Sequence, residues 1–256
     1  MFSLATDRWP LAADKWGEIM NCIQAVKDEL QNYIDSEKAG FLPRFFKTGP
    51  GEYGEGDRFI GVTVPNQKKA ARKYYKDISL DEVGQLLQEP IHEYRLTALF
   101  MLVLKYEKLR TETERKAVTD LYLSSTSCIN NWDLVDSSAH KILGPYFWDK
   151  DKELLYEFAN SGDLWKQRIA IITTYHFIRN LQFEDTLNIA KILLHHKHDL
   201  IHKAVGWMLR EIGNRDFATE FNFLKEHYRQ MPRTMLRYAV EKFEEGLRQQ
   251  FLKGLV

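Results

Sequence analysis

The sequence has few cysteines, no long apolar run, and few glycines and prolines outside one segment. Cys22 and Cys128 are the only cysteines among 256 residues. They form neither a disulfide framework nor the spacing of a metal site, which points to a reducing cytosol. The opening MFSLATDRWPLAADKWGE lacks a basic leader followed by an apolar run, so we expect no secretory signal. No stretch approaches the roughly 18 apolar residues of a membrane-spanning helix, so we expect no membrane association.

The sequence also lacks an excess of either charge. Lysine plus arginine number 36 and aspartate plus glutamate 36, a formal net charge of zero. Nucleic-acid-binding proteins usually carry a basic excess, so this balance argues against such a partner unless the cations gather on one face. With 44% hydrophobic residues the chain can build a core, and its length suits one large domain or a continuous repeat array. We expect a single domain over residues 1–256.

Glycine and proline concentrate in residues 43–65, which we interpret as the one long loop. Before it, apolar residues at helical spacing predict an amphipathic helix over about residues 12–36, within an N-terminal extension of residues 1–40. After it, runs such as RLTALFMLVLKYEK and IHKAVGWMLREI are apolar on a wide stripe, and alternating strand patterns are scarce. The sequence therefore predicts an all-α fold.

Five alanines mark a loose internal repeat. They are spaced 41, 31, 34 and 35 residues apart, at Ala98, Ala139, Ala170, Ala204 and Ala239. This period is typical of helical hairpin repeats of the HEAT or armadillo kind. Such repeats stack into a curved solenoid whose inner helices line a concave surface. A non-repetitive helical bundle is the alternative.

The segment NNWDLVDSS has the pattern of a helix start. Asn130 or Asn131 is suited to cap it, and Asp133 suits the first turn, where the helix dipole favours a carboxylate. Trp132 and Asp136 are four residues apart, so they share one face of that helix. Capping accounts less well for Asp136. Its plainer interpretation is an acid that is solvated or salt-bridged at the surface.

Trp207 and Arg168 lie in two further helical segments, AVGWMLREIG and LWKQRIAII. A tryptophan in an apolar helix is most often part of the core. An arginine inside a repeat often pairs with an acid of the next repeat. If both instead face the concave wall with Trp132 and Asp136, two indole faces, a carboxylate and a guanidinium line one surface.

Two other motifs carry little weight. The segment GPGEYG at residues 49–54 matches the glycine pattern of dinucleotide sites, but no strand precedes it and acidic residues surround it. We interpret it as an ordered loop between helices. His195, His198 and His202 are spaced as metal ligands can be, but they lack a suitable acidic or cysteine partner, so we expect no metal site.

Basic residues gather in two regions, one after the glycine-rich segment and one in the last repeats. Lysines and arginines near helix starts are suited to phosphate contacts, although each alone is equally typical of a solvated face. The candidates for contact with a nucleic-acid backbone are Lys68, Lys69, Lys203, Arg210, Arg233 and Arg237.

Taken together, these segments resemble the AlkD-type alkylpurine DNA glycosylases, a family of HEAT-like repeats. The resemblance runs from about Arg44 to about Lys242 and rests on RFFK…FIGVTVP, WDLVD, LWKQRIAI and HKAVGWMLREIG. It implies that Asp136 is the catalytic aspartate, that Trp132 and Trp207 flank the lesion, and that Arg168 is a functional arginine. A tyrosine that the family can carry in the cleft is replaced by Phe45, which keeps an aromatic face and loses a hydroxyl.

The resemblance implies a monofunctional glycosylase that excises positively charged N3- or N7-alkylpurines from double-stranded DNA and leaves an abasic site, in base excision repair. It implies no metal or other cofactor, a monomer, and a location in the bacterial cytosol at the nucleoid. The four residues suit this chemistry, because a cationic base is already a good leaving group and one carboxylate suffices to stabilise the sugar cation. Indole faces attract the cationic nucleotide, and Arg168 is expected to hold a backbone phosphate.

Two alternatives stay open. One is a relative that binds damaged or branched DNA without cutting it, which the altered Phe45 position and the long glycine-rich segment allow. The other is a HEAT-type scaffold for a protein partner, which the net charge of zero supports. DNA binding that weakens steeply with salt separates the first from the second.

Overall fold

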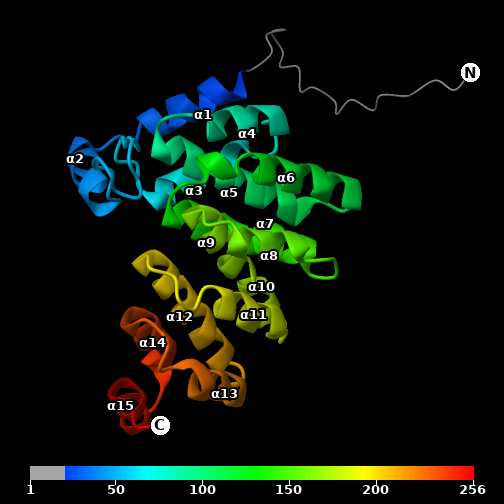
Figure 1. Ribbon diagram of the computed structural model, residues 1–256. Helices are drawn as coiled ribbons and strands as arrows, with labels where there is room; N and C mark the ends of the chain where they lie inside the picture. The colour runs from blue at the N-terminus through cyan, green and yellow to red at the C-terminus, as the bar shows by residue number, and fades with distance from the viewer. Residues whose placement is uncertain (1–20) are drawn as a thin grey trace, which may run out of the picture.

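The computed structural model describes residues 21–256, which fold into a stack of α-helices running from α1 at one end to α15 at the other (Figure 1). The helices are α1 Cys22–Gln31, α2 Ser36–Phe45, α3 Val64–Tyr74, α4 Leu80–Leu87, α5 His92–Lys108, α6 Glu112–Ser124, α7 Trp132–Phe147, α8 Glu153–Asn160, α9 Leu164–Thr173, α10 Tyr175–Arg179, α11 Glu184–Ile192, α12 Asp199–Gly213, α13 Phe217–His227, α14 Arg233–Ala239 and α15 Glu245–Lys253. The prediction of an all-α fold is confirmed.

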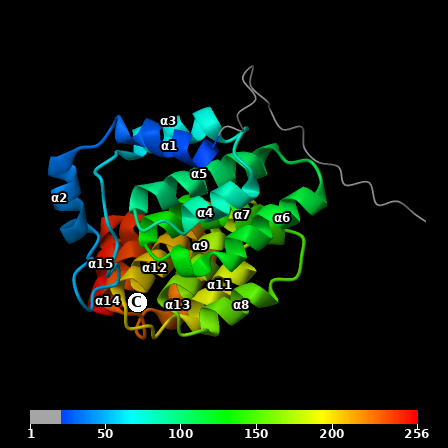
Figure 2. The ribbon, with the colours of Figure 1, turned by 90° about the horizontal axis from the view of Figure 1, so that it is seen from above.

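The helices form two layers. In the inner layer α5 packs on α7, α7 on α9, α9 on α12 and α12 on α14. In the outer layer α4, α6, α8, α11 and α13 each pack against a member of this row. The view from above places α2, α12 and α14 on one side and α6 and α8 on the other (Figure 2). This succession of helix pairs is the arrangement that the repeat pattern predicts.

The five alanines that define the repeat lie one on each inner helix. All are fully buried: Ala98 on α5, Ala139 on α7, Ala170 on α9, Ala204 on α12 and Ala239 on α14. A small side chain at the same place in each helix lets neighbouring helices approach closely. Gly206 of α12 also allows a close approach to α14, because a Cβ there would lie 2.4 Å from the Met235 carbonyl oxygen.

The N-terminal region differs from the expected long helix over residues 12–36. Residues 12–20 lie outside the part of the chain that the structure describes. In the remainder, α1 ends at Gln31 and a new helix, α2, begins at Ser36, capped by the Asp35 carboxylate. Ile34 falls in the turn between them and is 51% exposed, so it does not continue the apolar face of α1.

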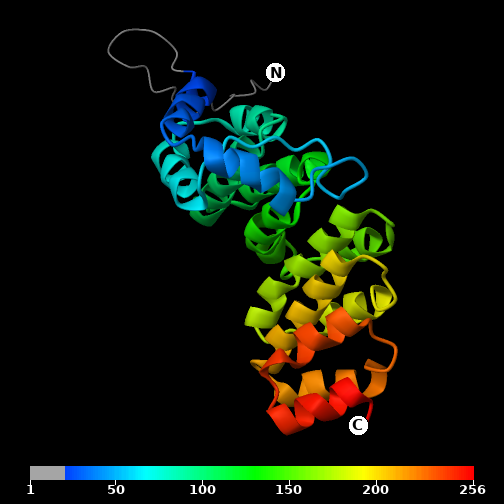
Figure 3. The same ribbon diagram turned by 90° about the vertical axis from the view of Figure 1, so that its left-hand side faces the viewer.

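The loop between α2 and α3 spans residues 46–63, within the range expected from glycine and proline. Pro43 lies inside α2, and Pro65 lies in the first turn of α3, where its missing N–H costs nothing. Figure 3 shows this loop, in blue to cyan, projecting beyond the N-terminal helices. None of the helices between residues 21 and 256 combines the length and apolar character that crossing a bilayer requires.

Candidate functional site

The inner helices enclose a hollow of about 530 Å³, here called the central hollow. Its wall is contributed by α2, the loop after it, α7, α9, α12 and α14. The residues that line it are Phe45, Lys47, Tyr53, Trp132, Asp136, Arg168, Asp199, Leu200, Lys203, Trp207, Arg210 and Tyr238. The four residues singled out in the sequence, Trp132, Asp136, Arg168 and Trp207, therefore meet at one place. They come from three helices, α7, α9 and α12, and the two tryptophans are 75 residues apart along the chain.

Asp136 and Arg168 form a two-pronged ion pair across α7 and α9. The Arg168 Nε donates to Asp136 Oδ1 at 2.9 Å and its Nη2 donates to Oδ2 at 2.8 Å. A further Arg168 N–H donates to the Leu200 carbonyl oxygen of α12. The Arg168 side chain is only 6% exposed, whereas that of Asp136 is 19% exposed and reaches the hollow. Arg168 thus holds the carboxylate in a fixed orientation from its buried side.

The contacts of Arg168 indicate that it positions Asp136. Each of its three guanidinium nitrogens donates a hydrogen bond, Nε and Nη2 to Asp136 and Nη1 to the Leu200 carbonyl oxygen. Its side chain is only 6% exposed. A buried guanidinium bonded in this way is suited to position the carboxylate. The phosphate contact that the resemblance implies for Arg168 stays a prediction.

The charge state of Asp136 reflects two opposed effects. Burial raises the pKa of the Asp136 carboxyl above its usual range, and the Arg168 guanidinium offsets part of that increase. Desolvation makes the ionised carboxylate less stable, because less water screens its charge, and a nearby positive charge restores that stability. A cation placed in the hollow would therefore be attracted strongly to Asp136.

Trp132 is the first residue of α7 and packs against aromatic neighbours. Its ring stacks on Phe46 at 5.4 Å between centroids with 19° between planes, and Phe45 meets it edge-on at 6.1 Å. The N-cap is Asn131, whose side chain accepts from the Trp132 backbone N–H at 2.9 Å. Phe45 itself is 51% exposed at the rim. The indole is therefore fixed at a helix start, with part of its surface open to the hollow.

A buried polar network anchors this corner. His92 bridges two acids, Asp57 of the loop at 2.9 Å and Asp133 of α7 at 2.9 Å. Arg95 also donates to Asp57, and the Asn131 amide donates to it at 3.2 Å. Burial alone would lower the pKa of His92, but the two carboxylates outweigh burial and raise it to about 9. A charged His92 thus ties the loop, α5 and the first turn of α7 together.

Trp207 lies on α12, which packs on α9, the helix that follows α7 in the inner row. It is half-buried, packs against Tyr175 at 5.8 Å between ring centroids, and donates its indole N–H to Glu211 at 3.1 Å. On α12 the hollow is lined by residues 199, 200, 203, 207 and 210, which recur at helical spacing along one face. This spacing gives α12 the largest share of the wall.

The predicted cations divide into two groups. Lys203 and Arg210 line the hollow, where Lys203 pairs with Asp199 at 2.8 Å and Arg210 pairs with Glu241.

The other four lie outside the lining. Lys68 and Lys69 are exposed on α3, where Lys69 donates to the Tyr33 hydroxyl at 2.8 Å. Arg233 donates to the Leu252 carbonyl of α15, and Arg237 is exposed on α14. These four remain predictions for contacts beyond the hollow.

Sequence reasoning did not single out Lys47, Tyr53, Asp199 or Tyr238 as parts of the site. Asp199 and Tyr238 follow from helical spacing and from the repeat once the inner face of each helix is known. Tyr53 lies in the glycine-rich loop, and no local pattern predicts where it points.

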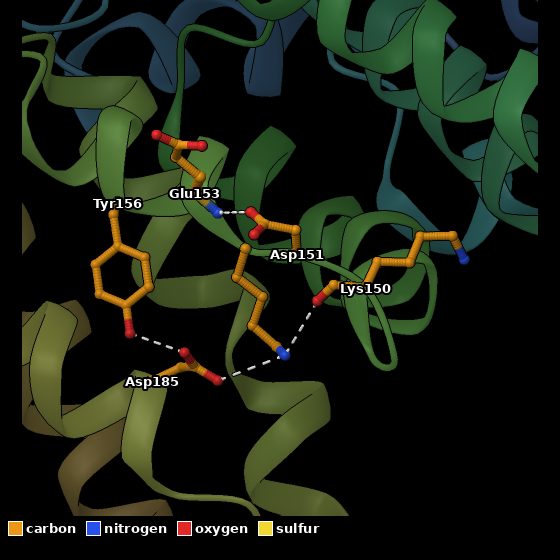
Figure 4. Close-up of a pocket in the computed structure, with 6 residues that line it drawn as sticks. Lys150, Asp151, Glu153, Tyr156 and Asp185 are labelled. Atoms are coloured by element: carbon orange, nitrogen blue, oxygen red, sulfur yellow. Dashed lines mark hydrogen bonds and ion pairs between the residues drawn. The ribbon is translucent and has the colours of Figure 1, made fainter.

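A second hollow lies where α8 meets α11 and is lined by charged side chains (Figure 4). Asp185 there accepts from the Tyr156 hydroxyl at 2.8 Å and lies 3.7 Å from Lys152. Its groups satisfy one another, which indicates a junction between helices.

Between residues 21 and 256 no group of three or more His, Cys, Asp or Glu side chains is arranged to hold a metal ion. His202 donates its Nε2–H to the His196 carbonyl oxygen.

Comparisons with known proteins agree with this architecture. The fold is similar to that of a predicted DNA alkylation repair enzyme from Enterococcus faecalis, with a TM-score of 0.65 and 17% identity over 84% of this chain and 99% of that one. At that identity the likeness concerns the fold alone. No curated protein matches the sequence. The family model for DNA alkylation repair enzymes matches residues 26–243. The chain therefore belongs to the DNA alkylation repair enzyme family.

Proposed function

We propose that this protein is a monofunctional DNA glycosylase that hydrolyses the N-glycosidic bond of positively charged N3- or N7-alkylpurines and leaves an abasic site. The observation that carries the proposal is the arrangement of the central hollow. One desolvated carboxylate, Asp136, lines the same hollow as two indoles, Trp132 and Trp207, and is held by two hydrogen bonds from Arg168. Family membership supports the DNA substrate.

The chemistry fits a single acid. Alkylation at N3 or N7 gives the purine a positive charge, so the base leaves without being protonated first. As the bond to C1′ lengthens, positive charge develops on the sugar, and a carboxylate beside it stabilises that charge. Asp136 is held in place before the reaction, which avoids reorganisation in the transition state. The same carboxylate is suited to orient the water that adds to C1′.

Trp132 and Trp207 serve as the aromatic walls in this proposal. An indole face attracts a cation by roughly 0.5–2 kcal/mol, more where water is excluded. The half-buried positions of both rings leave such faces available in the hollow. Lys203 and Arg210 at the rim would contact the phosphates on either side of the lesion. A lyase step needs a neutral amine at C1′. The hydrogen bond to Asp199 raises the pKa of Lys203, which disfavours its neutral form, and Lys47, the other lysine of the lining, lies 4.0 Å from Glu52.

The decisive experiment is release of 7-methylguanine from a duplex that carries one such base, measured under single-turnover conditions. Asp136→Asn should lower the rate at least about 100-fold, the effect typical of losing one preorganised electrostatic group, while the duplex still binds. Asp199→Asn is the matched control at saturating protein, where a change in affinity does not alter the rate, because it removes another carboxylate of the same hollow that the proposal leaves outside the chemistry. Excision by Asp136→Asn within a few fold of wild type would contradict the proposal. A wild type that binds this duplex but releases no base would indicate a binding protein.

A further inference from the structure

The indole of Trp132 lies at one end of a stack of four rings. Phe46, the residue that follows α2, lies against it at 5.4 Å between centroids, with 19° between the planes. Phe46 stacks in turn on Phe59 of the loop at 5.0 Å and 15°. Phe59 stacks on His92 of α5 at 4.7 Å and 27°. Four separate segments of the chain therefore contribute rings whose successive planes are nearly parallel.

The ring at the far end of the stack is held on both sides. His92 is 2% exposed, and its two ring nitrogens lie 2.9 Å from Asp57 and 2.9 Å from Asp133. Burial by itself lowers the pKa of His92, yet the two carboxylates raise it to about 9, so both nitrogens donate at neutral pH. Rotating the imidazole would break a buried hydrogen bond between charged groups, which is among the strongest kinds. His92 is therefore fixed in one orientation.

The same imidazole also holds the backbone of Trp132. Asp133, which His92 contacts, is the next residue of α7. Asp57, its other partner, accepts from the Asn131 amide at 3.2 Å, and the Asn131 side chain accepts from the Trp132 backbone N–H at 2.9 Å. The place of the Trp132 backbone and the tilt of its side chain thus depend on the same charged ring.

The stack leaves part of the indole open to the central hollow. Phe46 covers one face of Trp132, and Phe45 meets the indole edge-on. Trp132 is nonetheless partly exposed and lines the hollow together with Asp136. An aromatic ring attracts a cation over its face and not at its edge, so the attraction depends on how the ring is tilted.

We infer that His92 is a positioning residue that sets the orientation in which the Trp132 indole meets a bound alkylated nucleotide. The inference rests on the proposed function for its ligand, whereas the orientation of the indole is a property of the free protein. His92 is not among the residues that line the hollow, so it acts through the stack and the first turn of α7. Asp136 keeps its two hydrogen bonds from Arg168 when His92 is replaced, so the loss falls on Trp132.

The first test is a double-mutant cycle of His92→Gln and Trp132→Leu, read by single-turnover release of 7-methylguanine at saturating protein. His92→Gln should lower the rate about tenfold with duplex affinity within about threefold of wild type, because misplacing a positioned group by about 1 Å costs up to about 100-fold. In the Trp132→Leu background it should lower the rate by no more than about twofold, because the ring through which it acts is already gone. Effects that multiply would show that His92 acts elsewhere, and would overturn the inference.

The second test needs no reaction. Fluorine NMR of protein labelled with 5-fluorotryptophan resolves the tryptophans, and Trp132→Leu identifies the resonance of Trp132. His92→Gln and Phe46→Leu should each shift or broaden that resonance and leave the resonance of Trp148, at the other end of α7, in place. Phe223→Leu is the matched control, because Phe223 of α13 is 5% exposed against 7% for Phe46. It should leave the Trp132 resonance unchanged. An unchanged Trp132 resonance in both His92→Gln and Phe46→Leu overturns the inference.

The outcomes separate this inference from the proposed function. If wild type releases 7-methylguanine while His92→Gln changes neither the rate nor the Trp132 resonance, the inference is wrong and the proposed function stands. If wild type releases no base, the proposed function is wrong. The inference is then judged by the affinity for a duplex whose 7-methylguanine is stabilised by a 2′-fluorine, relative to undamaged duplex. His92→Gln must lower that ratio in wild type but not in Trp132→Leu, and an unchanged ratio overturns it. Thermal melting shows whether His92→Gln folds. If it unfolds, Phe46→Leu, which keeps both partners of His92, carries every comparison.

Discussion

Replacing Arg168 with glutamine should weaken both the fold and the pH tolerance of excision. Arg168 is 5% exposed and makes two charged hydrogen bonds to Asp136 and one to the Leu200 carbonyl. Removing one partner of a buried ion pair costs about 3–5 kcal/mol, because the remaining charge stays desolvated. Glutamine retains one donor, so we expect the free energy of unfolding to fall by about 3 kcal/mol. Arg110→Gln, at an exposed arginine, should change it by less than about 0.5 kcal/mol.

The same substitution should move the acidic limb of the pH–rate profile. Burial already raises the pKa of Asp136, and Arg168 is the group that lowers it again. Without Arg168 the pKa rises further, so the carboxylate takes up a proton at a higher pH and excision fails there. Single-turnover rates on the 7-methylguanine duplex between pH 4.5 and 8 would show the limb shifted upward by roughly one pH unit or more. If Arg168→Gln keeps both the wild-type limb and the stability of Arg110→Gln, Arg168 does not position Asp136 as described.

Three further outcomes follow from charged groups elsewhere. His92, with its pKa raised to about 9, stabilises the fold fully below its unfolded value of 6.5 and loses that contribution as pH rises through 9. His92→Gln should therefore lower the free energy of unfolding in urea by about 3 kcal/mol at pH 6, and by much less at pH 9.5. Glu220 is buried, and burial raises its pKa to about 9, so keeping it neutral costs stability increasingly from pH 4.5 upward. Glu220→Gln should stabilise the protein by about 3 kcal/mol at pH 7 and have little effect at pH 4, by the same assay. Asp199→Asn frees Lys203 and should tighten binding of undamaged duplex about threefold at low salt, measured by fluorescence anisotropy; weaker binding would contradict this assignment.

The repeat was predictable because a small residue recurs along the sequence at a regular interval. A small residue recurs wherever two inner helices touch, and Ala98, Ala139, Ala170, Ala204 and Ala239 are all buried there. Once the period is known, the inward face of each helix follows from helical spacing, and that spacing places Asp136 beside Trp132 on one face. Because the repeats stack, Arg168 and Trp207 line the same hollow as Trp132 and Asp136.

Features that depend on contacts between distant residues were not predictable. The break between α1 and α2 interrupts a continuous apolar pattern, and there Asp35 N–H donates to the Ile60 carbonyl of the loop. Tyr53 reaches the hollow because Asp57 is fastened to His92, 35 residues further along the chain. The three acceptors of Arg168 were not predictable for the same reason, since they lie on α7 and at the start of α12.

The neutral net charge argues less strongly against DNA than composition alone suggests. At the rim of the central hollow the cations are already paired, Lys203 with Asp199 and Arg210 with Glu241. A phosphate that approaches either cation can replace the carboxylate, because both acids are about half exposed and regain water when released. Binding then exchanges one anion for another at each position, so it needs no excess of lysine and arginine. This arrangement favours a protein that samples undamaged duplex weakly and gains its affinity from the cationic base in the hollow.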